Sequence, residues 1–149
     1  WIIEKKETTH RIKKFEKSSY SAKQSSSLVL TKDQIIANIS NKSFELVDAR
    51  SKERFLGLQP EQRKELKSGN IEGSKNMPFS ILINKENHTF KDKVELISIF
   101  KKNKIDSKKQ LAFTCGSGVT ACILGLANSI INGKKPIIYD GSWAEYGLK

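Results

Sequence analysis

Residues 109–122, KQLAFTCGSGVTAC, constrain the fold of this chain more than any other segment. Residues 111–114 are a short apolar run of the kind found in buried strands, and the run ends at Cys115. A loop of residues 116–118, Gly-Ser-Gly, follows, and an apolar pattern with helical spacing begins at Val119. We therefore predict a strand, a tight turn and a helix N-terminus, with a thiol at the turn.

This junction favours a reactive cysteine. The backbone N–H groups of such a loop converge, and the positive end of the helix dipole lies beneath them. Both effects stabilise a thiolate over a thiol, so we expect Cys115 to be a nucleophile. The alternative is a buried, inert cysteine. The glycines at 116 and 118 favour the reactive one.

The composition sets limits on metals and disulfides. With 149 residues the chain is long enough for one domain with its own core. Cys115 and Cys122 lie on either side of the predicted helix start, so we expect no disulfide and a reducing compartment. Neither His10 nor His88 has ligand spacing to a cysteine or to the other histidine. We predict neither a metal site nor an organic cofactor.

The net charge of +11 allows several partners. The lysines are scattered among serines and glutamates without interleaved aromatic residues, which disfavours nucleic acid and favours a basic surface for anionic substrates. The longest apolar stretch, residues 121–131, contains Asn128 and Ser129 and is too short to span a bilayer. We predict no membrane span.

The chain divides into a polar segment and a compact domain. Residues 1–27 are rich in Lys, Glu and Ser without a sustained period, so we expect a linker or extended arm. Residues 28–149 carry the apolar patterns and form the predicted domain. Because the first residue is Trp1 and not Met, we expect the sequence to be a fragment.

Short apolar strands alternate with helical patterns in this domain. We expect strands at 44–48, 111–114 and 137–139, helices at 91–102 and 119–131, a helix that starts at the capping box of residues 31–34, a helical turn at 51–55 and a long loop at 59–76. The helix at 91–102 is expected to bury Val94, Ile97 and Phe100, and Cys122 to be a core side chain. The alternation predicts an α/β fold with a parallel sheet, whose ligand site lies beyond the carboxyl ends of the strands.

Three other sites use similar glycine loops. Residues 116–121 fit the G-x-G-x-x-A dinucleotide fingerprint, with Asp140 as the ribose-binding acid. This unit is the last strand–helix–strand of the chain, which leaves too little sequence for a dinucleotide fold. A Walker A loop is excluded because no Gly-Lys-Ser/Thr follows. A cysteine phosphatase needs an arginine that closes the loop, where this sequence has Ala121.

Together the motifs resemble a rhodanese domain, and more narrowly the C-terminal, catalytic domain of the two-domain mercaptopyruvate/thiosulfate sulfurtransferases. The match covers about residues 28–147. Besides CGSGVTAC and YDGSW, it rests on Asp48-Ala49-Arg50, Arg54-Phe55-x-Gly57, Pro60-Glu61-x-Arg63 and Gly69-Asn70-Ile71-x-Gly73-Ser74-x-Asn76-x-Pro78. The resemblance implies a parallel sheet of about five strands flanked by helices on both faces. Residues 1–27 would then be the tail of an N-terminal domain and the interdomain linker.

The family mechanism proceeds through a persulfide. The resemblance implies that Cys115 takes sulfur from a donor and passes it to a thiol, thioredoxin or cyanide. Ser117 matches the hydroxyl that assists proton movement at the substrate carbonyl, and Arg54 and Arg63 match the arginines that bind the substrate carboxylate. In the family, a loop surrounds the sulfur of this cysteine, and the residues of this chain that match it are Gly116, Ser117, Gly118, Val119 and Thr120. Arg50 is expected to pair structurally, and Asp140 and Trp143 to pack or cap the loop.

The resemblance also bears on donor and location. Thiosulfate-preferring relatives look basic at the two positions after the cysteine, whereas Gly116 and Ser117 are uncharged, so 3-mercaptopyruvate is favoured over thiosulfate. The family implies a mitochondrial location, with the cytoplasm as the alternative. Two features depart from the pattern. Asn70 stands where many relatives have histidine, and the family's further catalytic histidine and aspartate belong to the N-terminal domain, since His10 does not match that motif.

A second hypothesis is a rhodanese-like domain that serves as an accessory subunit, docked to a larger assembly by its basic, serine-rich arm. The intact loop at Cys115 favours the enzyme.

Overall fold

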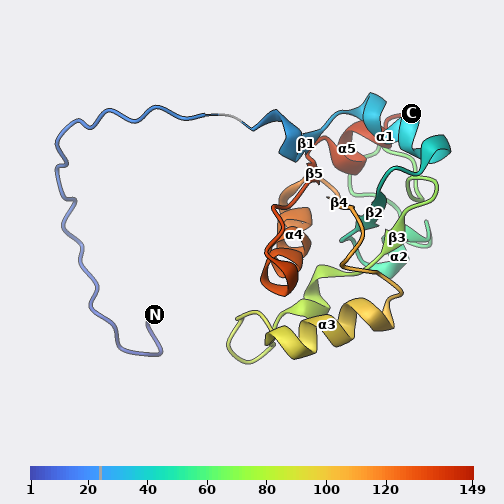
Figure 1. Cartoon of the computed structure of the whole chain (residues 1–149). Helices are drawn as coiled ribbons and strands as arrows, with labels where there is room; N and C mark the ends of the chain where they lie inside the picture. The colour runs from blue at the N-terminus through green and yellow to red at the C-terminus, as the bar shows by residue number, and fades with distance from the viewer. Residues whose placement is uncertain (24) are drawn as a thin grey trace.

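The computed structural model describes residues 1–23 and 25–149 (Figure 1). Residues 1–23 are exposed and lead away from the folded part of the chain, with a turn near the start. Regular structure begins at the 3₁₀ turn η1, Ser26–Leu28. Among the described residues, no helix combines the length and the apolar character that crossing a membrane requires.

The predicted parallel sheet of about five strands is confirmed. The strands are β1 (Val29–Leu30), β2 (Glu45–Asp48), β3 (Lys75–Asn76), β4 (Leu111–Thr114) and β5 (Ile138–Tyr139). They form a five-stranded sheet in the order β1-β5-β4-β2-β3, and every pair is parallel. The edge strands β1 and β3 were not predicted, because each is defined by its pairing with a strand distant in the sequence, and β3 lies inside the expected loop.

Four of the five helices begin close to the predicted positions, and the fifth, at residues 142–146, was not predicted. They are α1 (Lys32–Asn41), α2 (Lys52–Phe55), α3 (Lys93–Lys102), α4 (Val119–Asn132) and α5 (Ser142–Tyr146), with a 3₁₀ turn η2 (Phe79–Leu82). Thr31 and Asp92 each form a capping box, which satisfies backbone N–H groups at the starts of α1 and α3. Gly133, with a φ of 73°, ends α4 in the left-handed conformation that glycine adopts without strain.

Helices cover both faces of the sheet. Neighbouring residues of β2 and β4 point to opposite faces, as the period of a strand requires. Val47 and Phe113 belong to the core beneath α3 and α4. Leu46 and Ala112 belong to a second core beneath α1 and α5. Because β2 and β4 are buried on both sides, their apolar residues follow one another, at 46–47 and 111–113, rather than alternating with polar ones.

Two packing predictions were wrong. In α3, Val94 is 77% exposed and Ile97 is 45% exposed, whereas Leu96 and Phe100 are buried. The buried pair is spaced i, i+4, one of the two spacings that share a helix face, and the sequence alone did not show which apolar stripe turns inward. In α4, Cys122 is exposed rather than a core side chain, because Ala121 and Leu124 form the inward face.

The two faces of α3 give a matched pair of substitutions. Leu96→Ala removes a fully buried side chain and is expected to lower the free energy of unfolding by about 2–5 kcal/mol. Val94→Ala, on the exposed face, is expected to change it by less than about 1 kcal/mol. Urea denaturation followed by circular dichroism measures both. Equal losses would contradict the assigned orientation of α3.

Candidate active site

The predicted strand, turn and helix at Cys115 are confirmed. β4 ends at Thr114, and α4 begins at Val119. Gly118 is the N-cap of α4, with a φ of 81°. A Cβ atom at Gly118 would lie 2.6 Å from Oδ1 of Asp140 and 2.9 Å from the Asp140 carbonyl oxygen. Backbone conformation and close approach therefore both require glycine at this position.

The hydroxyl of Ser142 closes the loop from below. Ser142 is fully buried, and its Oγ accepts hydrogen bonds from the backbone N–H groups of Cys115 and Gly118, both at 3.1 Å. The same Oγ donates to the carbonyl of Tyr139 at 2.8 Å. Ser142 also has a φ of 49°, which places its side chain under the loop at a backbone cost of about 1–3 kcal/mol.

The start of α5 holds the carbonyl groups of the same loop. The N–H of Trp143 donates to the Cys115 carbonyl at 3.0 Å, and that of Ala144 donates to the Gly116 carbonyl at 2.9 Å. These carbonyls accept their hydrogen bonds from α5 and not from the amides of their own loop. Within residues 1–23 and 25–149, the N–H groups of Gly116, Ser117, Val119 and Thr120 donate no hydrogen bond. Those amides are free to bind an anion.

Sequence reasoning missed Ser142 as the residue that ties this loop. It singled out Asp140 and Trp143 from the same motif instead. Trp143 is buried and donates its Nε1–H to the Lys67 carbonyl at 2.9 Å, so it is a packing residue as expected. Asp140 is exposed, and its carboxylate makes no hydrogen bond to the described residues. A serine directly after a strand-ending Asp-Gly was the available signal.

Cys115 lies under the loop rather than on the surface. The residue is 2% exposed and belongs to the same core as Val47 and Phe113. Gly116 above it is half-buried and Ser117 is exposed. Gly116 and Ser117 therefore form the more exposed side of the loop.

A cavity of about 160 Å³ lies on that side of the loop. It is lined by Arg54, Glu61, Gln62, Arg63, Leu66, Gly116, Ser117 and Ala144. The structure thus brings together both predicted carboxylate-binding arginines and two of the predicted loop residues. Val119 and Thr120 lie on the first turn of α4 outside this lining, and Val119 is 72% exposed.

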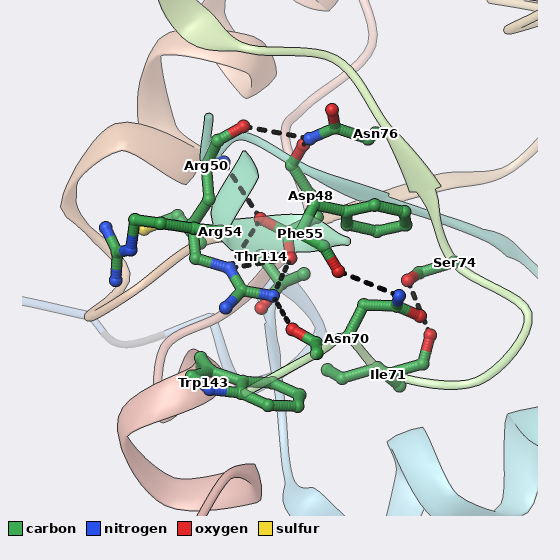
Figure 2. Close-up of polar contacts among 12 residues, drawn as sticks. Asp48, Arg50, Arg54, Phe55, Asn70, Ile71, Ser74, Asn76, Thr114 and Trp143 are labelled. Atoms are coloured by element: carbon green, nitrogen blue, oxygen red, sulfur yellow. Dashed lines mark hydrogen bonds and ion pairs between the residues drawn. The ribbon is translucent and has the colours of Figure 1, made fainter. Parts of the chain in front are cut away.

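Arg50 forms a buried ionic centre next to this cavity. Figure 2 shows its guanidinium group between the carboxylate of Asp48 and the ring of Trp143. The nearest Arg50–Asp48 contact is 2.7 Å, and the guanidinium carbon lies 4.5 Å from the centre of the Trp143 ring. Arg50 also donates to the Gly69 carbonyl at 2.8 Å. The structural pairing expected for Arg50 is therefore observed.

Arg54 is held at the edge of the cavity. Its Nη2 donates to Glu61 at 2.5 Å. A Cβ atom placed on Gly116 would lie 3.3 Å from the same Nη2, so the guanidinium rests against the cysteine loop. Asn70 donates to the Phe55 carbonyl at 2.9 Å (Figure 2) and so ties the end of α2 to the loop that follows.

Cys122 is the second thiol near the site. It lies on the first turn of α4, and its Sγ is 3.4 Å from the Gly118 carbonyl oxygen. Partial burial and, secondarily, the neighbouring Cys115 and Asp140 raise the pKa of Cys122. Within the described part of the chain, no group of three or more His, Cys, Asp and Glu residues could hold a metal ion.

A parallel α/β sheet with a cysteine in a glycine loop at a strand–helix junction places this cysteine beyond the carboxyl end of its strand, where ligand sites of such sheets lie. A model of the Rhodanese-like domain matches residues 31–149. The chain therefore belongs to the rhodanese family.

The relatives it matches are sulfurtransferases. It is 39% identical over 135 residues to mouse 3-mercaptopyruvate sulfurtransferase, covering 90% of this chain and 45% of that protein. It is 38% identical over 147 residues to mouse thiosulfate sulfurtransferase, covering 98% and 49%. The chain thus spans about half the length of these relatives. Because both donor specificities occur at nearly the same identity, similarity does not distinguish the donor.

Solved structures share the fold. The sub-stoichiometric sulfur transferase subunit of yeast mitochondrial complex I superposes with a TM-score of 0.71 at 34% identity, covering 80% of this chain and 42% of that one. Rhodanese-like sequence and rhodanese-like fold therefore agree.

The role of Ser142 is tested by its removal. Ser142→Ala leaves the buried N–H groups of Cys115 and Gly118 without an acceptor and is expected to lower the free energy of unfolding by about 1–3 kcal/mol. Ser40→Ala, on the exposed surface of α1, is the control and should change it by less than about 0.5 kcal/mol. Thermal and urea unfolding measure both, and a neutral Ser142→Ala would show that the loop does not depend on this hydroxyl.

Proposed function

We propose that this domain is the sulfur-transferring half of a sulfurtransferase, with 3-mercaptopyruvate as donor and a thiol, such as that of thioredoxin, as acceptor. The observation that carries the proposal is the loop around Cys115. Two of its carbonyls accept hydrogen bonds from α5, and four of its amides donate none to the described residues. Two of its residues, Gly116 and Ser117, line the cavity that two arginines also line. An anion-binding loop around a thiol suits a reaction whose intermediate is a negatively charged persulfide.

In the first half-reaction the Cys115 thiolate attacks the sulfur of the donor. A sulfur–sulfur bond forms, the carbon–sulfur bond breaks, and its electron pair remains on carbon as the enolate of pyruvate. A proton delivered to that carbon gives pyruvate. The hydroxyl of Ser117, which is exposed at the cavity wall, would assist proton movement at the carbonyl.

In the second half-reaction the acceptor thiolate attacks the outer sulfur of the persulfide. This forms the acceptor persulfide and returns the Cys115 thiolate. A second thiol then releases hydrosulfide and leaves a disulfide on the acceptor. Between the two half-reactions, the amides of Gly116, Ser117, Val119 and Thr120 would stabilise the charge of the enzyme persulfide, with no metal or organic cofactor.

The lining of the cavity supports an α-keto acid donor. The two positions after Cys115 carry no charge, while Arg54 and Arg63 supply cationic hydrogen-bond donors suited to one carboxylate. Thiosulfate, a compact dianion, is the second choice.

A second candidate function is an accessory subunit. The burial of Cys115 in the core favours this reading, and one similar structure is a subunit of yeast mitochondrial complex I. The same similarity supports a mitochondrial location, with the cytoplasm as the alternative. In either function we infer that residues 1–27 link this domain to an N-terminal rhodanese domain, which would supply the family's further histidine and aspartate.

Loading of Cys115 with sulfur distinguishes the two functions. After incubation with 3-mercaptopyruvate, we expect a mass increase of about 32 Da on Cys115 that a reductant removes, since a persulfide is reducible whereas two added oxygens of nearly equal mass are not. Sulfide release with added thiol should be lost in Cys115→Ser. Cys122→Ser, which alters the neighbouring thiol outside the loop, should retain both signals.

The assay uses the 149-residue chain and, in parallel, a protein in which the proposed N-terminal rhodanese domain precedes it. Absence of the mass increase and of sulfide release in both would reject the enzyme and support the accessory function. A mass increase on Cys122 alone would show that the wrong thiol was assigned.

The carboxylate site gives a kinetic prediction. Arg63→Ala should raise KM for 3-mercaptopyruvate about 10-fold or more, because a charge-assisted contact to the carboxylate is lost. Lys64→Ala removes the adjacent exposed cation, which does not line the cavity, and is the matched control. Steady-state sulfide release measures both. Equal KM values for the two variants would place the carboxylate elsewhere.

A further inference from the structure

Glu61 is a buried carboxylate between two arginines. Its side chain is only 2% exposed. Its Oε1 accepts from Nη1 of Arg50 at 2.9 Å, and its Oε2 accepts from Nη2 of Arg54 at 2.5 Å. A weaker contact of 3.4 Å joins Nε of Arg54 to Oε1. Two nitrogens of the Arg54 guanidinium therefore donate to the Glu61 carboxylate.

The two arginines differ in solvent exposure and in the number of their contacts. The Arg50 side chain is 1% exposed and is fixed by Asp48, the Gly69 carbonyl and the Trp143 ring. The Arg54 side chain is 31% exposed and reaches the cavity. Because Glu61 accepts hydrogen bonds from both arginines, the position of Arg54 depends on that of Arg50. Without Glu61, Arg54 would be one flexible cation among several at the surface.

The carboxylate also sets the charge of the cavity. Asp48, Arg50, Glu61 and Arg54 together carry no net charge, so Arg63 is the uncompensated cation among the residues that line the cavity. One net positive charge matches one carboxylate. A dianion would bring a second negative charge close to the buried carboxylate of Glu61. The repulsion between the two charges is stronger where the effective dielectric constant is lower than that of water.

We propose that Glu61 is a positioning and specificity residue: it orients Arg54 toward the cysteine loop and offsets its charge, so that the site selects a singly charged carboxylate over a doubly charged donor. The inference rests on the proposed function, because it assigns the donor carboxylate to this cavity. It adds a residue that does not itself touch the donor.

Binding of two unreactive anions tests the inference without turnover. Affinities for pyruvate, a monoanion, and sulfate, a dianion, are measured by NMR titration of the protein. Glu61→Gln keeps the shape of the side chain and removes its charge, and should shift the affinity ratio toward sulfate by about tenfold. Glu61→Asp keeps the charge but shortens the side chain, so it should lower the affinity for both anions and leave the affinity ratio unchanged. Glu65→Gln, an exposed glutamate of the same loop, should match the wild type.

A purely structural role for Glu61 predicts a different result. Equal weakening of both anions in Glu61→Gln, with the ratio unchanged, would overturn the inference, as would a wild type that binds neither anion. If Glu61→Gln does not fold, Arg54→Gln replaces it and should change the affinity ratio in the opposite direction. Loss of the cation should lower the affinity for sulfate more than the affinity for pyruvate. An equal loss of both affinities would again overturn the inference. A wild type that binds pyruvate yet takes no sulfur from 3-mercaptopyruvate rejects the proposed function alone.

Discussion

The hydroxyl of Ser142 is the contact on which the geometry of the cysteine loop depends. By accepting from the N–H groups of Cys115 and Gly118 it joins the end of β4 and the start of α4 to the start of α5. The first amides of α5 bind the loop carbonyls in turn. Because these bonds use the polar groups on the inner side of the loop, the outward amides remain available to an anion.

A chain of buried charges supports the other wall of the site. Asp48, Arg50 and Glu61 have side chains that are 1–2% exposed, and each charge has an opposite partner. Such pairs often add little net stability, since desolvation offsets their attraction. Their effect here is geometric: they fix the loop that follows α2 against the sheet and hold Arg54 beside Gly116. Buried polar contacts thus hold both the loop at Cys115 and the Arg54 side of the cavity.

Much of the fold could be predicted because its signals are local. The apolar runs of β2 and β4, the capping boxes at Thr31 and Asp92 and the glycine at 133 depend on neighbouring residues only. The edge strands, the inward face of α3 and the exposure of Cys122 could not be predicted, because each depends on packing against distant segments. The division at residue 27 and the catalytic roles stay predictions.

The sequence by itself determined the parallel α/β class and the placement of Cys115 in a glycine loop at a strand–helix junction, since strand, turn and helix signals follow one another within a few residues. Tertiary structure alone decided which groups surround that loop. Arg54 and Glu61 come from the segment after β2, and Ser142 comes from the segment after β5. Both segments are distant from Cys115 in the chain, and only the parallel sheet, by gathering the carboxyl ends of its strands at one edge, brings them to its loop.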